Sequence, residues 1–367
     1  MAGCQWLRAH AYASAQPGAG GFHQRTLARE AGSRGTGWGA KVRGRMVTLG
    51  FHASHEQFPP SELLRLAQRA DAAGFDAALN SDHFHPWTDA QGQSGFAWSW
   101  MGAALATTKL KSIGVVNAPG QRYHPAIIAQ ALGTLAEMFP GRAWAALGSG
   151  QLVNEGITGQ RWPAKDQRNA RLLECVEVMR ALFRGETVTY RGLITVEEAK
   201  LYSRPVTPPM LVGAAITPET AEWVGGWADG LITVNKPPAE LRKMVEAFKR
   251  GGGEGKPMFL KVQLSWAEDE KEAERGAMEQ WSANIFASSV LTDLRKPAQF
   301  AEMARTVQPK DLDGHVRVSS NLQRHVDWLA EDVKLGFSRL YLHNVNRGQE
   351  AFIQAFSEKV LPALRKP

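Results

Sequence analysis

Short apolar runs alternate with segments of helical periodicity from Met46 to the end of the chain. This alternation is typical of parallel strands joined by crossover helices. Eight runs have the length and composition of buried strands, at residues 47–52, 77–81, 112–117, 143–147, 210–213, 230–234, 259–264 and 339–343. Eight such units favour a closed (β/α)8 TIM barrel of the α/β class over an open sheet.

The joints between helix and strand repeat a short pattern. Gly74, Gly226 and Gly336 each stand where a helical period ends, and an aromatic residue follows each of them. We expect each glycine to end its helix in the left-handed conformation. Two stretches interrupt the alternation, 186–209 before the fifth strand and about 282–315 after the seventh. We expect a small hairpin in the first and extra helices over the barrel mouth in the second.

Polar and titratable residues gather after the carboxyl ends of the predicted strands, where TIM barrels carry their active sites. These positions hold His52, His55, Glu56, Asp82, His83, His85, Asn117, Arg122, Ser149, Gln151, Asn154, Asn235, Lys236 and His343. An imidazole beside carboxylates can exchange a proton near neutral pH, as a redox step on a hydroxyl group requires. Any one of these histidines could be structural, so the prediction depends on the cluster.

Two other site types are disfavoured by the same positions. The stretch Asp82-His83-Phe84-His85 resembles a metal-binding pair, but the fifth and sixth strands end in residues that supply no further ligands. We therefore expect no metal. No G-x-G-x-x-G stands between a strand and a helix, which argues against a dinucleotide-binding Rossmann fold.

The net charge of +7 comes mainly from the first 45 residues, which hold seven basic residues and one acid and leave about +1 on the rest. The remainder thus lacks the basic field that nucleic-acid binding requires. We predict that residues 1–45 are a disordered basic extension preceding a natural start at Met46, with a targeting peptide as the alternative. Cys4 and Cys175 suggest no disulfide, no segment is suited to span a membrane, and we expect a reducing, cytoplasmic location.

Four segments together resemble one family. They run over residues 53–58, 81–87, 122–130 and 148–155, and the resemblance extends from Met46 to the C-terminus. The chain is similar to the coenzyme F420-dependent glucose-6-phosphate dehydrogenase group of luciferase-like proteins, and to a related subgroup of flavinoid oxidoreductases that use an ordinary flavin.

The resemblance implies a role for each matched residue. His83 would exchange a proton with the substrate hydroxyl, while Glu56, Trp87 and Gln151 would line the reaction centre. Val115 and Val116 would sit at a strained non-proline cis peptide, and Thr233 and Lys236 would face the substrate. The cofactor contacts would be Asp82, Val115, Val116, Ala118, Ser149, Gly150, Asn154, Ile216, Thr217, Glu219 and Thr220.

Three departures from the family pattern change the expected proton transfer, cofactor binding and substrate binding. Gln151 replaces the family's proton-exchanging glutamate, and an amide can donate a hydrogen bond but cannot titrate. Ile216-Thr217 replaces the Gly-Gly pair that cradles the cofactor phosphate. Of three cations that grip the sugar phosphate only Lys236 has a counterpart, because the other two positions fall near Leu291 and Gly314. Glucose 6-phosphate is therefore disfavoured as a substrate.

These observations lead to one principal hypothesis and two alternatives. The principal one is hydride transfer between a hydroxyl or carbonyl substrate and FMN, with coenzyme F420 as the second cofactor candidate. The alternatives are a monooxygenase that uses reduced flavin and a non-catalytic flavin-binding protein. We expect a small-molecule substrate, a homodimer and, for a monooxygenase, a partner flavin reductase.

Overall fold

The computed structural model describes residues 47–365, and within them eight parallel strands close into one barrel. The strands are β1 (Thr48–Ala53), β2 (Ala77–Ser81), β3 (Ser112–Asn117), β4 (Ala143–Leu147), β7 (Leu211–Ala214), β8 (Leu231–Val234), β9 (Met258–Ser265) and β11 (Arg339–Asn344). The barrel closes because β1 pairs with β11, β11 with β9, and β9 with β8. The predicted TIM barrel is confirmed, with every strand end within one residue of its predicted place. The predictions for residues 1–45 lie outside the described residues.

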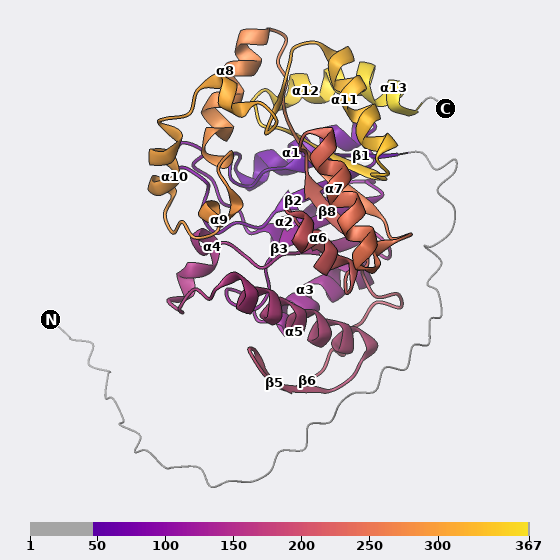
Figure 1. Cartoon of the computed structure of the whole chain (residues 1–367). Coiled ribbons are helices and arrows are strands. Elements are labelled where there is room, and N and C mark those ends of the chain that lie inside the picture. Colours follow the sequence, from indigo (N-terminus) through magenta and orange to yellow (C-terminus); the bar gives the residue numbers. More distant parts are fainter. Residues whose placement is uncertain (1–46, 366–367) are drawn as a thin grey trace, which may run out of the picture. The chain divides into compact units, whose positions relative to one another are not determined.

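The helices surround the strands (Figure 1). The longer ones are α1 (Pro60–Ala72), α2 (Ala97–Thr107), α3 (Pro125–Met138), α5 (Lys165–Arg184), α6 (Pro218–Gly225), α7 (Pro238–Phe248), α8 (Glu270–Trp281) and α11 (Leu322–Lys334), followed by α12 (Gln349–Ala355) and α13 (Leu361–Arg365). Proline opens several of them, because its fixed φ suits the first turn and its missing N–H costs nothing there.

The predicted glycine joints are only partly correct. Gly74 and Gly336 are left-handed, with φ of 91° and 100°. Gly226 is right-handed, with φ of −75°. The helical turn continues past it, since the N–H groups of Trp227 and Ala228 both donate to the Val224 carbonyl.

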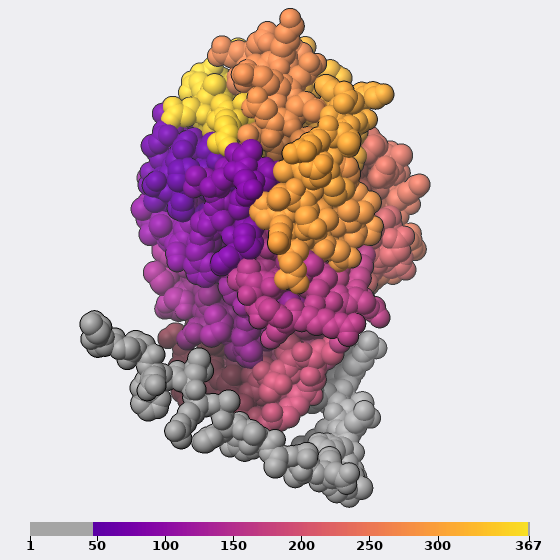
Figure 2. Space-filling view, turned by 90° about the vertical axis from the view of Figure 1, so that its left-hand side faces the viewer, coloured from indigo at the N-terminus to yellow at the C-terminus, as the bar shows by residue number. Residues whose placement is uncertain are grey.

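Both predicted insertions are present. The first contains an antiparallel hairpin of β5 (Val188–Arg191) and β6 (Thr195–Ala199). The second contains α9 (Ser288–Leu291), α10 (Pro297–Ala304) and short turns, and in Figure 2 its orange surface lies against the purple surface of the first third of the barrel. It leads into β10 (Arg317–Val318), a strand that we did not predict, which pairs with the carboxyl end of β9.

The barrel interior is filled by aromatic rings facing glycines. Trp144, Phe259 and Tyr341 pack together, with ring centres 5.1 to 6.3 Å apart. A Cβ on Gly114 would lie 2.2 Å from the Trp144 ring, and one on Gly50 would lie 2.4 Å from the Tyr341 ring. The glycines thus make room for a solid plug below the barrel mouth.

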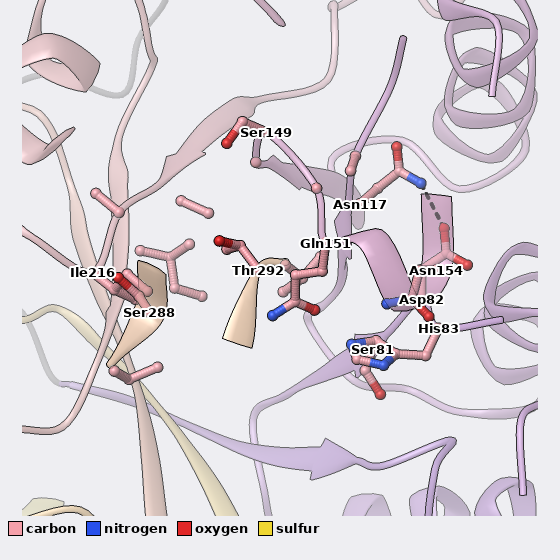
Figure 3. Close-up of a pocket in the computed structure, with 18 of the residues that line it drawn as sticks. Ser81, Asp82, His83, Asn117, Ser149, Gln151, Asn154, Ile216, Ser288 and Thr292 are labelled. Atoms are coloured by element: carbon pink, nitrogen blue, oxygen red, sulfur yellow. Dashed lines mark hydrogen bonds between the residues drawn. The ribbon is translucent and has the colours of Figure 1, made fainter. Parts of the chain in front are cut away.

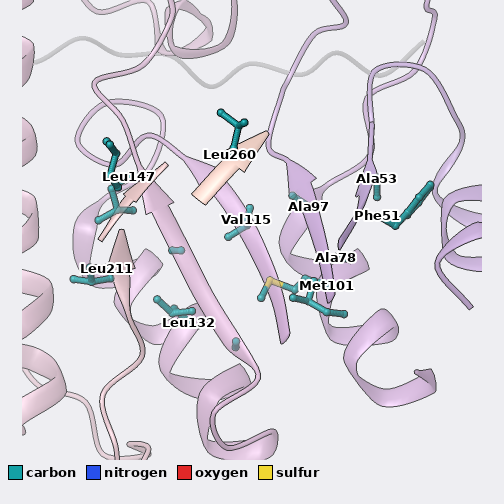
Figure 4. Packing of buried hydrophobic residues seen from close by; sticks show 14 of the residues in the cluster. Phe51, Ala53, Ala78, Ala97, Met101, Val115, Leu132, Leu147, Leu211 and Leu260 are labelled. Atoms are coloured by element: carbon teal, nitrogen blue, oxygen red, sulfur yellow. The ribbon is translucent and has the colours of Figure 1, made fainter. Parts of the chain in front are cut away.

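A second core lies between the strands and the helices (Figure 4). Successive residues of a strand point to opposite faces, so each strand contributes alternate side chains to it. Val115 belongs to this outer core and is fully buried, while Val116 packs with the interior cluster. The peptide bonds of residues 47–365 are all trans. The predicted cis peptide at Val115-Val116 is therefore wrong in this structure, where both residues continue the regular pairing of β3 with β4.

Candidate active site

A cavity of about 350 Å³ opens at the carboxyl ends of the strands. Figure 3 shows Asp82 and His83 on one side of it, Ile216 and Ser288 on the other, and Gln151 between them. Most of the predicted site residues line this cavity: Glu56, Asp82, His83, Trp87, Val116, Ala118, Ser149, Gly150, Gln151, Asn154, Ile216, Thr220 and Thr233. Its volume lies at the lower end of the range for small-molecule sites.

His83 and Glu56 form the central pair of the site. The Nε2 atom of His83 lies 3.5 Å from Oε1 of Glu56, and both side chains are largely buried. The other carboxylate oxygen of Glu56 accepts hydrogen bonds from Ser54 at 2.9 Å and Ser81 at 2.6 Å. The Nδ1 atom of His83 is buried without a partner, whereas Nε2 is the ring nitrogen next to Glu56.

The pKa values of His83 and Glu56 are both lowered, which leaves the histidine neutral and the glutamate ionised. Burial lowers the pKa of His83, and the charges of Arg122 and Lys261 add to this while Glu56 opposes it. Burial works to raise the pKa of Glu56, but His83, Lys261 and the Ser81 hydroxyl hold it down at about 2. A neutral imidazole therefore stands beside an ionised carboxylate at neutral pH.

Asp82 is held in place by three neighbours. The Asn117 amide donates to it at 2.5 Å and the Tyr123 hydroxyl at 3.1 Å, while an Arg122 nitrogen lies 3.4 Å away. Arg122 also donates its backbone N–H to Glu155. Burial raises the pKa of Glu155 to about 7, against the opposing charge of Arg122. Arg122, whose role the sequence left open, thus organises the acids beneath the cavity wall.

In the loop after β4, the backbone at Gly150 packs closely against neighbouring side chains. Gly150 has φ of +85°, and a Cβ there would lie 2.8 Å from Glu155 Cγ and 3.4 Å from Ala118 Cβ. Gln151 follows and projects into the cavity (Figure 3). Asn154, in the short helix α4 (Leu152–Glu155), accepts hydrogen bonds from the N–H groups of Phe84 and His85. It thereby ties the β4 loop to the loop that carries His83.

Trp87 forms part of the wall next to His83. Its ring centre lies 4.8 Å from that of His83 and 5.4 Å from that of Phe300 on α10. The second insertion therefore supports the reaction centre from outside. Ser288, Ser289 and Thr292 of the same insertion line the cavity directly.

Four predicted residues do not line the cavity. Val115 faces the outer core, as its place in β3 dictates. Thr217 caps α6, where its hydroxyl accepts from Thr220 N–H, and Glu219 is fully exposed. Lys236 is partly buried and lies 3.5 Å from Glu240, four residues further along the chain. Direct contact of these side chains with a ligand is therefore not supported by this structure.

Three cations that we did not predict line the cavity instead: Lys165, Arg168 and Lys261. Arg168 stacks on Trp162 at 4.4 Å and has a buried Nε without a partner. Lys261 has a signal in the sequence, because a lone lysine interrupts the apolar run 258–264. No pattern in the sequence marks Lys165 and Arg168, because only the tertiary fold brings the start of α5 to the cavity.

Residues 47–365 contain no group of three or more His, Cys, Asp or Glu side chains arranged to hold a metal ion. In the same part of the chain, no helix combines the length and apolar character needed to cross a membrane. Cys175 is buried and unpaired, and burial raises the pKa of its thiol to about 12.

Comparisons with known proteins agree with this architecture. A protein of Beutenbergia cavernae named F420-dependent glucose-6-phosphate dehydrogenase is 32% identical over 330 residues, which cover 87% of this chain and 98% of that protein. The protein of the same name from Mycolicibacterium smegmatis is 31% identical over 332 residues, again 87% and 98%. A solved F420-dependent secondary alcohol dehydrogenase, in complex with an F420-acetone adduct, is 30% identical with a TM-score of 0.82, covering 88% of this chain and 100% of its own.

A sequence model of the luciferase-like monooxygenase family matches residues 43–339. The predicted luciferase-like barrel and the predicted oxidoreductase are both confirmed at this level. The chain belongs to the luciferase-like monooxygenase family.

Proposed function

We propose that this protein transfers a hydride between the carbinol or carbonyl carbon of a small substrate and coenzyme F420 held in the barrel mouth. The observation that carries the proposal is a buried, neutral His83 that lines the cavity with its Nε2 3.5 Å from the ionised Glu56. The names of the relatives at 31% to 32% identity, and of the solved alcohol dehydrogenase, favour F420 as the cofactor. The replacement of the phosphate cradle by Ile216 and Thr217 keeps FMN as the alternative.

The cavity suits a flat polar ring with an anionic tail. Gly150 lines the cavity at a position where a Cβ would collide with Glu155, and Gln151 can donate its amide to the ring edge. Lys165 and Arg168 line the same cavity and supply positive charge for a phosphate, with Asp293 3.6 Å from the Arg168 guanidinium. When bound, the cofactor supplies the centre that accepts or returns a hydride.

His83 handles the proton that accompanies the hydride. In alcohol oxidation the substrate would lose a hydride from its carbinol carbon and a proton from its hydroxyl group, and His83 would accept that proton at Nε2. The product is the carbonyl compound, and the imidazolium so formed is stabilised by Glu56 at 3.5 Å. Carbonyl reduction runs through the same groups in reverse.

The test begins with cofactor-free protein titrated separately with F420 and FMN, followed by anaerobic assays with secondary alcohols. We expect reduction of the bound cofactor by an alcohol, and a loss of about 10²- to 10⁴-fold in kcat in His83→Asn with unchanged cofactor affinity. Oxygen uptake with supplied reduced FMN, without alcohol oxidation, would instead indicate a monooxygenase. Tight cofactor binding with no turnover of either kind would indicate a flavin-binding protein.

Glucose 6-phosphate should not be turned over. Lys236 pairs with Glu240 and does not line the cavity, and Leu291 and Gly314 carry no charge at the other two expected phosphate contacts. Each missing charge-assisted contact costs about 1.5 to 3 kcal/mol of binding. Turnover of glucose 6-phosphate at a rate similar to that of simple alcohols would contradict this part of the proposal.

A further inference from the structure

The cavity has two chemically different sides. On the side of β2, β3 and β4, Asp82, Asn117 and Gln151 offer a carboxylate and amides. On the side of β8, β9 and β1, Thr233, Lys261 and His52 line the same cavity. Strands β8, β9, β11 and β1 are consecutive neighbours in the barrel, so this second set forms one continuous part of the wall.

Lys261 occupies an inward position of β9. It follows Phe259, a member of the interior plug, by two residues, so both side chains point to the same face of the strand. Its Nζ lies 5.4 Å from the centre of the Trp281 ring. Among residues 47–365 it forms no ion pair and no hydrogen bond, and it borders the cavity. An ammonium group in this position is free to bind a ligand.

The neighbours of Lys261 are also donors without partners. Both ring nitrogens of His52 and the hydroxyl of Thr233 are buried and unpartnered within the described part of the chain. Burial, aided by the charge of Lys261, lowers the pKa of His52 well below its ordinary value, so its ring is neutral and carries one N–H. The His343 ring packs against it at 4.4 Å and supports it from behind. Buried polar groups normally have partners, and His52 and Thr233 both line the cavity, so their unpartnered polar atoms indicate a polar ligand beside Lys261.

No acid of the cavity forms an ion pair with Lys261 among residues 47–365, although the charge of Glu56 raises the pKa of the lysine against burial. Glu56 is engaged by Ser54, Ser81 and His83, and Asp82 by Asn117, Tyr123 and Arg122. Their oxygens are thus largely satisfied, whereas Lys261 is not. The side of the cavity formed by β8, β9 and β1 is therefore suited to a negatively charged oxygen group.

We propose that Lys261, with His52 and Thr233, binds the carboxylate of a small hydroxy acid or oxo acid whose reacting carbon lies next to His83. This inference rests on the proposed function for the reacting carbon, but the anion site itself does not. A three-ring cofactor would fill much of a cavity of about 350 Å³, so the remaining space suits only a small substrate. Lys261 is in this scheme a specificity-determining residue.

Matched ligand pairs test the proposal. Pyruvate and acetone share a methyl ketone and differ in the carboxylate, as do lactate and propan-2-ol for the alcohols. By isothermal titration of the cofactor-loaded protein, we expect pyruvate to bind at least tenfold more tightly than acetone, since one charge-assisted contact contributes about this much. Equal affinities for the two ketones would overturn the proposal.

Variants assign the effect to the lysine. We expect Lys261→Met to abolish the preference for pyruvate while leaving acetone binding within about twofold, and Lys261→Arg to retain part of the preference. Lys243→Met removes an exposed lysine of α7 and serves as the matched control. Circular dichroism spectra establish that each variant is folded. A pyruvate preference that survives in Lys261→Met would also overturn the proposal.

Turnover separates this inference from the proposed function. If neither lactate nor propan-2-ol reduces F420 or FMN, but pyruvate binding still depends on Lys261, the proposed function fails and the anion site stands. If propan-2-ol is oxidised with no advantage for lactate, the proposed function stands and the anion site fails. In the expected result, lactate has the higher kcat/KM and loses that advantage in Lys261→Met.

Discussion

The negative charge of Glu56 raises the pKa of His83 against the effect of burial. We therefore expect Glu56→Gln to lower the pKa of His83 further. In alcohol oxidation, which needs the neutral imidazole, the acidic limb of the kcat/KM profile should move to lower pH. The rate on the plateau should fall by about tenfold to a hundredfold, because the imidazolium loses its counter-charge. A profile from pH 4 to 8 measures both effects, and an acidic limb at the same pH as in the wild type would contradict the assignment of His83.

The lowered pKa of Lys261 should make the free energy of unfolding depend on pH in the alkaline range. Burial lowers its pKa from the ordinary 10.5 to about 8, against the opposing effect of Glu56. Between these values the unfolded chain binds more protons than the folded chain, so the contribution of Lys261 to the free energy of unfolding increases with pH in that window. At pH 7 the folded protein carries a penalty of up to about 3 kcal/mol.

We therefore expect Lys261→Met, which keeps a similar volume, to be more stable than the wild type at pH 7 by about 1 to 3 kcal/mol. The difference should shrink as the pH rises from 8 to 10.5. Urea unfolding at pH 7, 9 and 10.5 measures it, with Lys243→Met as the control. A difference that stays constant with pH would mean that Lys261 titrates normally.

At the scale of elements, the loop after β4 depends on a glycine for its function. Ala at position 150 would be strained at φ +85° and would also bring its Cβ to 2.8 Å from Glu155. We expect Gly150→Ala to lose at least tenfold in cofactor affinity. Gly141→Ala carries the same kind of strain, at φ +73°, with no atom within 4 Å of the new Cβ. It should lose about 1 kcal/mol of stability and keep its cofactor affinity, as fluorescence titration and thermal unfolding can establish.

Elements and individual side chains differ in how well the sequence predicts them. Strand positions follow from short apolar runs, and the loops at their carboxyl ends place Glu56, His83 and Gln151 at the mouth for any closed barrel. Successive side chains of a strand point alternately into the barrel and towards the helices. Which set points inward is decided by how the strand pairs with its neighbours, and the sequence alone does not show this. Both valines were predicted to contact the cofactor, but Val115 faces the outer core while Val116 lines the cavity.

Other parts of the site depend on tertiary packing that no local pattern encodes. Lys165 and Arg168 lie in the first turn of α5, and only the tertiary fold brings this turn to the cavity. Thr217 matches a cofactor contact by position, but its hydroxyl is used to cap α6. Lys261 could have been identified, since a charged residue at an inward strand position must meet either a partner or a cavity.

At the scale of the whole molecule, the aromatic plug supports the site from below. Trp144 from β4 fills the space left by Gly114 on β3 and packs on Phe259 and Tyr341 from β9 and β11. The next inward residues on β9 and β11 are Lys261 and His343. The aromatic plug therefore determines how far along the barrel axis the anion site lies. It also determines how opposite strands pack against each other.

Removing the Trp144 ring should lower both the free energy of unfolding and the affinity of the anion site. Truncation of a large aromatic side chain in a core costs about 3 to 5 kcal/mol, and we expect this loss in Trp144→Ala by chemical denaturation. Because the floor beneath Lys261 would then relax, pyruvate affinity should fall even under conditions where the variant is fully folded. Tyr202→Ala, at a side chain that is 88% exposed, is the control for loss of an aromatic ring alone. A Trp144→Ala protein that loses stability but keeps the affinity of the wild type for pyruvate would show that the site is held by its loops and strand ends, independently of the plug.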